Sequence, residues 1–469
     1  MWLGLPVVGR HGGLRVPIPG RAGWVIAALL GTGAMVLALL LVMCGMSPGG
    51  QRGGGADNGV LGGSEAMEQL GWGFTHTEFS ADRGEPAAEV EADRLLTGDP
   101  MPQNQHIMGW GARNPEPSPG KYDFHDLDRR LALMRSTGGT PVLTLCCSPD
   151  WMKGGKAGRT DWGELEKAPD ADHYEDFAKL AGKIAKRYPE VRHFIVWNEL
   201  KGFFDEDRNR WDYEGYTRLY NLVHKELKKV DPAIQVGGPY IVMDSYRPGE
   251  DSYASDLAGD WGSVDQRVLD AISYWNEHKA GADFLAVDGS SYTRDNSYAP
   301  DEFGATKKFG DVTRWLREET GLPVWWTEWY VEVADENDDR HGWSESHRTA
   351  VQATAMMEMA EAGVATALYW NPQNEDTDCP GCLWSSTELD DGGAELPMMK
   401  LLARFGKEFP PGTEFRSVSV APDDRPNVRV LADDAAVLVV NTVGRPIQAK
   451  VDGRTFDLPA YGLRWLERS

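Results

Sequence analysis

Short apolar runs alternate with amphipathic stretches along this chain from about residue 71 to residue 371. A short apolar run between amphipathic stretches indicates a strand. Eight such strands are predicted, at residues 71–77, 106–111, 141–148, 193–199, 234–240, 284–291, 324–330 and 365–371.

The amphipathic stretches carry apolar residues at helical spacing. In residues 170–190, Phe177, Leu180 and Ile184 recur at this spacing, and the Tyr188-Pro189 step ends the predicted helix. Further helices are predicted at residues 213–232, 265–278, 309–321 and 344–363.

Strand and helix alternating eight times favours an α/β fold, a (β/α)8 TIM barrel at residues 67–411. An open doubly wound sheet is the alternative. No GxGxxG or P-loop motif follows any of the predicted strands, which weakens a nucleotide-binding sheet.

The pattern changes after a predicted helix that ends at the Pro-Pro-Gly turn of residues 410–412. Short runs now alternate with polar turns, as in antiparallel strands. These runs lie at residues 415–420, 427–433, 435–443, 448–453 and 454–467. Residues 412–469 therefore predict a small antiparallel β-sandwich.

The N-terminal part contains an uncharged run of 23 residues, Trp24 to Met46, which is long enough to span a bilayer. Three arginines precede it, as expected for a cytoplasmic flank. We expect a basic cytoplasmic segment at residues 1–23, a transmembrane anchor at 24–46 and a Gly-rich linker at 47–66.

A cleaved secretion signal and a lipid anchor at Cys44 are alternatives to the transmembrane anchor. All three put the remainder of the chain outside the cytoplasm. The expected location is the cell membrane, with the catalytic domain extracellular, or secretion if the segment is cleaved.

Acidic residues dominate the composition, with a net charge of −24 over 469 residues. Such a surface repels nucleic acid and anionic polymers, which favours a neutral substrate. The chain also carries 18 Trp, which either pack in the core or form platforms for flat ligands such as sugars.

Five cysteines are present. Cys379 and Cys382 form a CxxC motif that, outside the cell, indicates a small disulfide more readily than half a zinc site. Pairing with the adjacent Cys146 or Cys147 stays open, and no further ligands at metal spacing are evident.

Two carboxylates end predicted strands. Glu199 ends the fourth and Glu328 ends the seventh, so in a barrel both face the mouth at the carboxyl ends of the strands. Two carboxylates about 5 Å apart suit a retaining glycosidase, with one as nucleophile and the other as acid/base. Asn198 fits beside them as a donor to the sugar 2-hydroxyl. A structural role in ion pairs is the alternative for both acids.

The Asn-Glu on strand four and the Glu on strand seven resemble the arrangement of clan A glycoside hydrolases. "HIMGWGARNPEPSPGKYDFHDLD" and "TPVLTLCCSPDWM" resemble glycoside hydrolase family 39, whose members include β-xylosidases, α-L-iduronidases and exopolysaccharide endoglycosidases. The resemblance covers about residues 68–460. It implies retention, with Glu199 as acid/base and Glu328 as nucleophile.

The chain departs from the clan pattern at strand six, where clan A enzymes commonly carry a His-x-Tyr group. Asp288 stands where that His would fall, and Tyr292 is the nearby phenol. We therefore expect Tyr292 at the substrate and an altered glycone subsite.

Other candidate substrate-binding residues follow predicted strands. The resemblance implies that Trp370, after strand eight, lies beneath the sugar ring. Trp110, Trp151 and His76 are weaker candidates because packing or a structural histidine explains each of them equally well.

The sequence thus predicts a retaining glycosidase resembling β-xylosidases of family 39, acting on an oligo- or polysaccharide without metal or organic cofactor. One alternative is an endo-acting enzyme on cell-surface or biofilm exopolysaccharide. The other is a non-catalytic carbohydrate-binding barrel. The glycone and the oligomeric state do not follow from the sequence.

Overall fold

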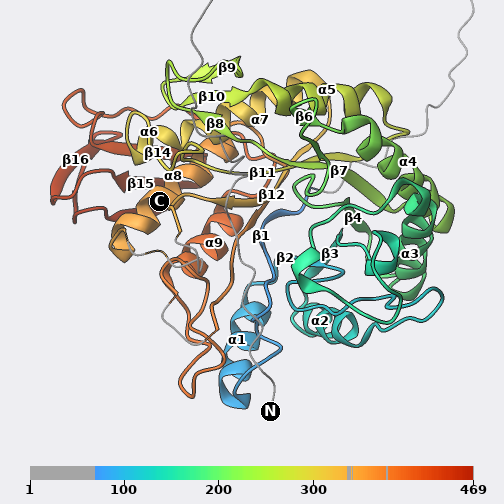
Figure 1. The fold of residues 1–469 in the computed structure, drawn as a ribbon. Helices are drawn as coiled ribbons and strands as arrows, with labels where there is room; N and C mark the ends of the chain where they lie inside the picture. The colour runs from blue at the N-terminus through green and yellow to red at the C-terminus, as the bar shows by residue number, and fades with distance from the viewer. Residues whose placement is uncertain (1–68, 335–339, 341, 376–378, 468–469) are drawn as a thin grey trace, which may run out of the picture. The chain divides into compact units, whose positions relative to one another are not determined.

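The computed structural model describes residues 69–334, 340, 342–375 and 379–467 (Figure 1). The predicted cytoplasmic, transmembrane and linker segments lie outside these residues. In the described part of the chain, no helix is long and apolar enough to cross a membrane.

Eight parallel strands close into a barrel in the order β1-β13-β12-β11-β7-β4-β3-β2 (Figure 1). Their bounds are β1 Gly71–Thr75, β2 Pro102–His106, β3 Thr140–Leu145, β4 His193–Val196, β7 Gln235–Val242, β11 Phe284–Ser290, β12 Val324–Tyr330 and β13 Thr366–Tyr369. The predicted eight-stranded barrel is confirmed, and the open doubly wound sheet is excluded.

One barrel strand was predicted in the wrong place. Of the predicted strand at 106–111, only His106 is in a strand: residues 107–111 form a loop, and β2 is the polar segment Pro102–His106. Its side chains are buried, and the amide of Asn104 is satisfied: Asn104 accepts from Thr144 Oγ1 at 2.9 Å and donates to Thr75 Oγ1 at 3.2 Å. A buried polar side chain is costly unless it is hydrogen-bonded. Hydrogen bonds between the strands offset this cost, so a polar segment can serve as a barrel strand.

Helices follow the strands as the pattern predicts. Their bounds are α1 Pro86–Gly98, α2 His125–Ser136, α3 Tyr174–Arg187, α4 Tyr213–Val230, α5 Gln266–His278, α6 Glu302–Ala305, α7 Lys307–Thr320, α8 Glu345–Glu361 and α9 Pro397–Glu408. Three short 3-10 helices are η1 Asp150–Met152, η2 Trp162–Glu164 and η3 Ala171–His173. In α3 the residues at helical spacing, Phe177, Leu180 and Ile184, are all buried.

Small antiparallel elements extend the loops at the carboxyl ends of two barrel strands. The pair β5 Phe204–Asp205 and β6 Arg210–Trp211 follows β4. A sheet in the order β8-β10-β9 follows β7, with β8 Ser245–Tyr246, β9 Ala254–Gly259 and β10 Gly262–Asp265. The sequence pattern did not predict either insertion, because these strands contain no apolar run, as ASDLAG of β9 and GSVD of β10 show.

The C-terminal part forms two antiparallel sheets, β14-β15-β18 and β16-β17. The bounds are β14 Val428–Ala432, β15 Ala436–Asn441, β16 Ile447–Val451, β17 Arg454–Leu458 and β18 Leu463–Glu467. Val437, Val439, Ala449, Val451 and Leu458 form a small core of their own.

The predicted first strand of this region, 415–420, is absent from the described structure apart from one bridge between Val420 and Val451. Leu438 and Val440 belong to the main barrel core, and the Trp465 ring lies 5.5 Å from the Phe409 ring after α9. The sheets therefore share apolar packing with the barrel.

Candidate active site

Three carboxyl groups meet at the carboxyl ends of the barrel strands. Glu199 lies just after β4, Asp288 near the end of β11 and Glu328 near the end of β12. One carboxylate oxygen from each lies within 4.8 Å of the others. The structure thus brings the two predicted catalytic acids together and adds a third carboxyl.

A register shift in β12 orients Glu328. Trp325 packs inside the barrel on Phe284, with ring centroids 3.8 Å apart, while Trp326 donates from Nε1 to Thr313 Oγ1 of α7. If side chains along β12 alternated strictly, Glu328 would lie on the same face as Trp326 and point away from the barrel interior. The pairing with β11 skips Thr327, so that Glu328 lies opposite Asp288. Bulges of this kind commonly re-aim a side chain next to an active site.

The backbone at Glu199 adopts an uncommon conformation. Trp197, Glu199 and Leu200 have φ of +72°, +48° and +48°, in the left-handed region that residues with a Cβ rarely occupy. Such residues cost about 1–3 kcal/mol each and cluster at functional sites. The end of β4 is therefore a place where packing holds the chain in a strained turn beneath a carboxylate.

Tyr240 supports Glu328. It lies in β7, is fully buried, and donates from its hydroxyl to Glu328 Oε1 at 2.5 Å. Burial, followed by the charge of Glu328, raises the pKa of Tyr240 well above its usual value, so the phenol stays a donor. Tyr240 was not among the predicted site residues, although it ends a predicted strand as Glu199 does.

Lys201 lies beside Glu199, with Nζ 3.4 Å from Oε2. Burial opposes its charge, but Glu199 and Glu166 outweigh burial and raise the pKa of Lys201. Its Nζ also lies 5.5 Å from the centroid of the Trp110 ring. The acid/base candidate therefore has a permanent cation as a neighbour.

The side-chain amide of Asn198 has its oxygen next to His106 and its nitrogen buried without a partner. Its Oδ1 lies 3.3 Å from His106 Nε2, and the Trp110 ring packs on His106 at 4.3 Å. Burial lowers the pKa of His106 to about 3, so the imidazole is neutral. Asn198 Nδ2 is buried and has no hydrogen-bond partner within the protein. An unpaired buried amide is costly, which marks it as a ligand donor.

Asp288 is the third carboxyl and is fully buried. Its Oδ1 lies 3.3 Å from the hydroxyl of Tyr330, and one of its carboxyl oxygens lies within 4.8 Å of an oxygen of Glu199. Burial, then the charges of Glu199 and Glu328, raise the pKa of Asp288 well above its usual value. The chain thus places an acid, not an imidazole, beside the two catalytic candidates.

Two further predicted residues lie near this cluster. The Tyr292 ring is 6.1 Å from the ring of Tyr330, which contacts Asp288. Trp370 directly follows β13 and is buried. Trp110 joins the site through His106.

Trp151 has a packing role instead. Its Nε1 donates to the carbonyl oxygen of Glu116 at 2.9 Å, and its ring meets His173 edge-on at 5.4 Å. These contacts lie in the loops after β2 and β3 and involve none of the three carboxyls, so the prediction that Trp151 binds substrate is not supported.

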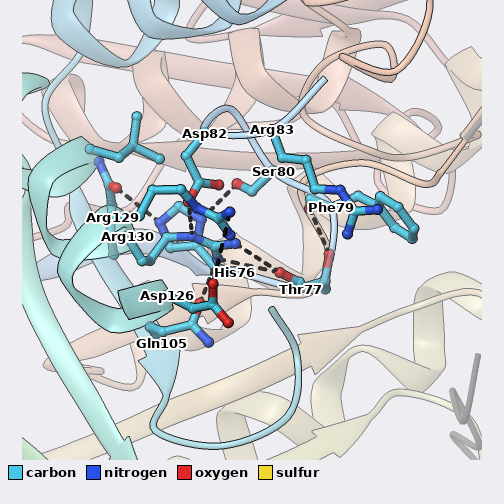
Figure 2. A network of polar contacts seen from close by, with 12 residues as sticks. His76, Thr77, Phe79, Ser80, Asp82, Arg83, Gln105, Asp126, Arg129 and Arg130 are labelled. Atoms are coloured by element: carbon cyan, nitrogen blue, oxygen red, sulfur yellow. Dashed lines mark hydrogen bonds and ion pairs between the residues drawn. The ribbon is translucent and has the colours of Figure 1, made fainter. Parts of the chain in front are cut away.

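His76 lies in a network of polar contacts, as Figure 2 shows. Its Nδ1 lies 2.7 Å from Ser80 Oγ and its Nε2 lies 3.0 Å from Gln103 Oε1, so both nitrogens are already paired. Burial lowers the pKa of His76 well below its usual value. In the same network, Arg130 of α2 donates to Asp82 at 3.0 Å (Figure 2). These contacts favour the structural alternative for His76, and its role in sugar binding stays a prediction.

The cysteines pair within their own motifs. Cys379 bonds to Cys382, and Cys146 bonds to Cys147. The disulfide within the CxxC motif removes these sulfurs as zinc ligands.

Comparison with known proteins adds a family to this geometry. Residues 110–357, more than half of the chain, match the model for glycosyl hydrolases family 39. A β-xylosidase of Caldicellulosiruptor saccharolyticus is 29% identical over 224 residues, which span 44% of this chain and 40% of that protein. The match therefore covers less than half of the relative's length.

Solved structures share the fold. A monomeric β-xylosidase from Caulobacter crescentus has a TM-score of 0.52 at 17% identity, covering 80% of this chain and 73% of that one. SrfJ from Salmonella typhimurium has a TM-score of 0.56 at 12% identity, with 86% and 90% covered. At these identities the likeness concerns the fold alone.

Proposed function

Because the chain belongs to glycosyl hydrolases family 39, we propose that it is a glycosidase that cleaves O-glycosidic bonds with retention of configuration. The observation that carries the proposal is the separation of Glu199 and Glu328, whose carboxylate oxygens lie within 4.8 Å. Retaining enzymes hold the two carboxyls about 5–5.5 Å apart, whereas inverting enzymes need about 6.5–9.5 Å for a water.

In the first step, Glu328 attacks the anomeric carbon and Glu199 gives its proton to the departing glycosidic oxygen. The hydroxyl of Tyr240 holds the attacking carboxylate in place. Asn198 Nδ2 donates to the sugar 2-hydroxyl, a bond that strengthens as the anomeric carbon gains positive charge.

In the second step, Glu199 accepts a proton from water, and the resulting oxygen nucleophile displaces Glu328 from the anomeric carbon. Formation of the glycosyl-enzyme removes the charge of Glu328, which makes Glu199 easier to deprotonate between the steps. Two displacements at one carbon restore the starting configuration.

We propose a neutral glycone, with β-xylosides as the first class to test. The net charge of −24 disfavours anionic polymers, and the curated relative is named a β-xylosidase. Asp288 at the clan histidine position favours a changed glycone preference, so the test includes glucosides, galactosides, arabinosides and exopolysaccharides.

The test uses this panel with the wild type and with Glu328→Ala and Glu199→Ala. NMR of the first product formed reads the anomeric configuration. We expect retention, with activity lost in Glu328→Ala. For Glu199→Ala, azide is expected to restore turnover of activated aryl glycosides and to give a glycosyl azide of retained configuration. An inverted product, or activity that survives in Glu328→Ala, would contradict the mechanism.

We also propose that residues 24–46 hold the enzyme at the cell membrane with its barrel outside, or direct its secretion. The support is the uncharged 23-residue run and its arginine flank. Fractionation of cells expressing the full chain, with protease added to intact cells, tests this. Recovery of protected protein in the soluble fraction would overturn it.

A further inference from the structure

Three carboxyl groups this close cannot all be ionised at once, because like charges within a few ångströms repel strongly. Their oxygens lie within 4.8 Å of one another. Glu328 receives a hydrogen bond from Tyr240, which stabilises its anion. Lys201 stands 3.4 Å from Glu199. Lys201 offsets part of the negative charge of Glu199 and Asp288 together, so a proton retained in the cluster at neutral pH belongs to this pair rather than to Glu328.

The titratable groups around Asp288 come from four elements. They are Glu199 and Lys201 after β4, Tyr240 of β7, Glu328 and Tyr330 of β12, and Lys308 in the first turn of α7. Burial lowers the pKa of Lys308 to about 8, so this cation is retained at neutral pH. Even with both lysines present, burial and the two glutamates dominate at Asp288.

The contact between Asp288 and Glu199 has a chemical requirement. Two carboxyl groups whose oxygens lie within 4.8 Å of each other repel unless one of them carries a proton, since an ionised carboxylate is an acceptor alone. Asp288 is fully buried, so water does not screen the repulsion between the two carboxylates in place of that proton. Its other close partner, the Tyr330 hydroxyl, is 3.3 Å away.

We propose that Asp288 and Glu199 share a single proton, and that Asp288 is a positioning residue that sets the pH range in which Glu199 protonates the leaving group. This inference rests on the proposed retaining mechanism. When Glu199 transfers the shared proton to the glycosidic oxygen, both carboxyls are left ionised, and Lys201, 3.4 Å from Glu199, offsets part of the added negative charge. In the second step, Glu199 regains a proton from water.

The pH profile of kcat/KM should therefore reflect the titration of Asp288 and Glu199 together, and not that of Glu199 alone. Loss of the last shared proton leaves two adjacent carboxylates, so repulsion delays that loss to higher pH. In Asp288→Asn the neighbour is always neutral, and Glu199 loses its proton earlier. We expect the basic limb of kcat/KM to move down by about one pH unit, so that activity above the limb falls about tenfold.

Leaving groups separate this effect from a general loss of structure. Aryl glycosides with poor leaving groups need the proton from Glu199, whereas dinitrophenyl glycosides do not. The shift is expected with the poor leaving groups and should vanish with dinitrophenyl glycosides. A uniform fall in kcat/KM with an unchanged profile, or superimposable profiles, would overturn the inference.

Asp126→Asn is the matched control, an acid-to-amide change at a buried position on α2. It is expected to leave the pH profile unchanged. If Asp288→Asn does not fold, infrared spectra of the wild type labelled with ¹³C-aspartate provide a second test. A protonated aspartic acid band should persist at neutral pH and change in Glu199→Gln. Absence of such a band refutes the shared proton.

The two proposals fail in different ways. If the wild type cleaves no glycoside in the panel, the proposed function fails, while the infrared test of the shared proton still stands. If the wild type is a retaining glycosidase rescued by azide at Glu199→Ala but Asp288→Asn keeps its basic limb, only the inference about Asp288 fails.

Discussion

Replacing Asn198 by Ala tests whether its buried amide binds the sugar 2-hydroxyl. His106 fixes Oδ1 at 3.3 Å, and Nδ2 is buried with no protein partner. A buried donor that loses its partner costs about 1–3 kcal/mol. Removal of this bond from the transition state should therefore lower kcat/KM about 5- to 150-fold.

The assay is a double-substitution cycle between enzyme and substrate. Wild type and Asn198→Ala are each measured on an aryl glycoside and on its 2-deoxy analogue. The 2-deoxy substrate has no hydroxyl to bind, so the loss caused by Asn198→Ala should shrink to a few-fold at most. Trp151→Phe, in a loop away from the carboxyls, serves as a control and should affect both substrates equally. An equal loss on both substrates in Asn198→Ala would refute the 2-hydroxyl contact.

Three further predictions follow from other residues. Tyr240→Phe removes a 2.5 Å donor to Glu328, and we expect kcat/KM to fall about tenfold or more in steady-state assays; unchanged kinetics would exclude the role. His76→Ala unpairs two buried partners, so thermal melts should show a loss of about 1–3 kcal/mol while kcat/KM of the folded enzyme stays constant; selective loss of substrate affinity would restore His76 to the site. Burial lowers the pKa of His193 to about 4, so its stabilisation is present above about pH 6.5 and is lost as pH falls through 4. Between pH 7.5 and 5, denaturant titration should show His193→Gln losing about 2 kcal/mol less stability than the wild type, and parallel pH curves would contradict this.

The sequence was sufficient to predict the barrel and the closeness of Glu199 and Glu328 at the ends of two of its strands. Both acids give local signals, because "FIVWNEL" and "VWWTEWY" each join an apolar strand to an acid at its end. The orientation of Glu328 was beyond sequence reasoning. It depends on a register shift at Thr327, and the register between two strands cannot be predicted from the sequence of either strand alone.

Residues were missed where the evidence lies in contacts between distant segments. β2 is polar, and its side chains become acceptable in the core only because other strands supply partners such as Thr75 and Thr144. Tyr240 reaches Glu328 across 88 positions of sequence. Trp151 and His76 were placed in the site because they follow strands, but a strand end does not specify which way a side chain turns.

The packing of the C-terminal sheets on the barrel has a consequence for folding. Leu438 and Val440 complete the main core, and Trp465 packs on Phe409, whose carbonyl oxygen accepts from Trp72 Nε1 of β1 at 3.2 Å. The first strand of the barrel is thereby linked to the last strand of the chain. We expect the barrel and the sheets to melt in one calorimetric transition, and a chain cut at residue 411 to aggregate through the uncovered apolar face. A nascent chain would then expose this apolar face until the C-terminal sheets have been synthesised.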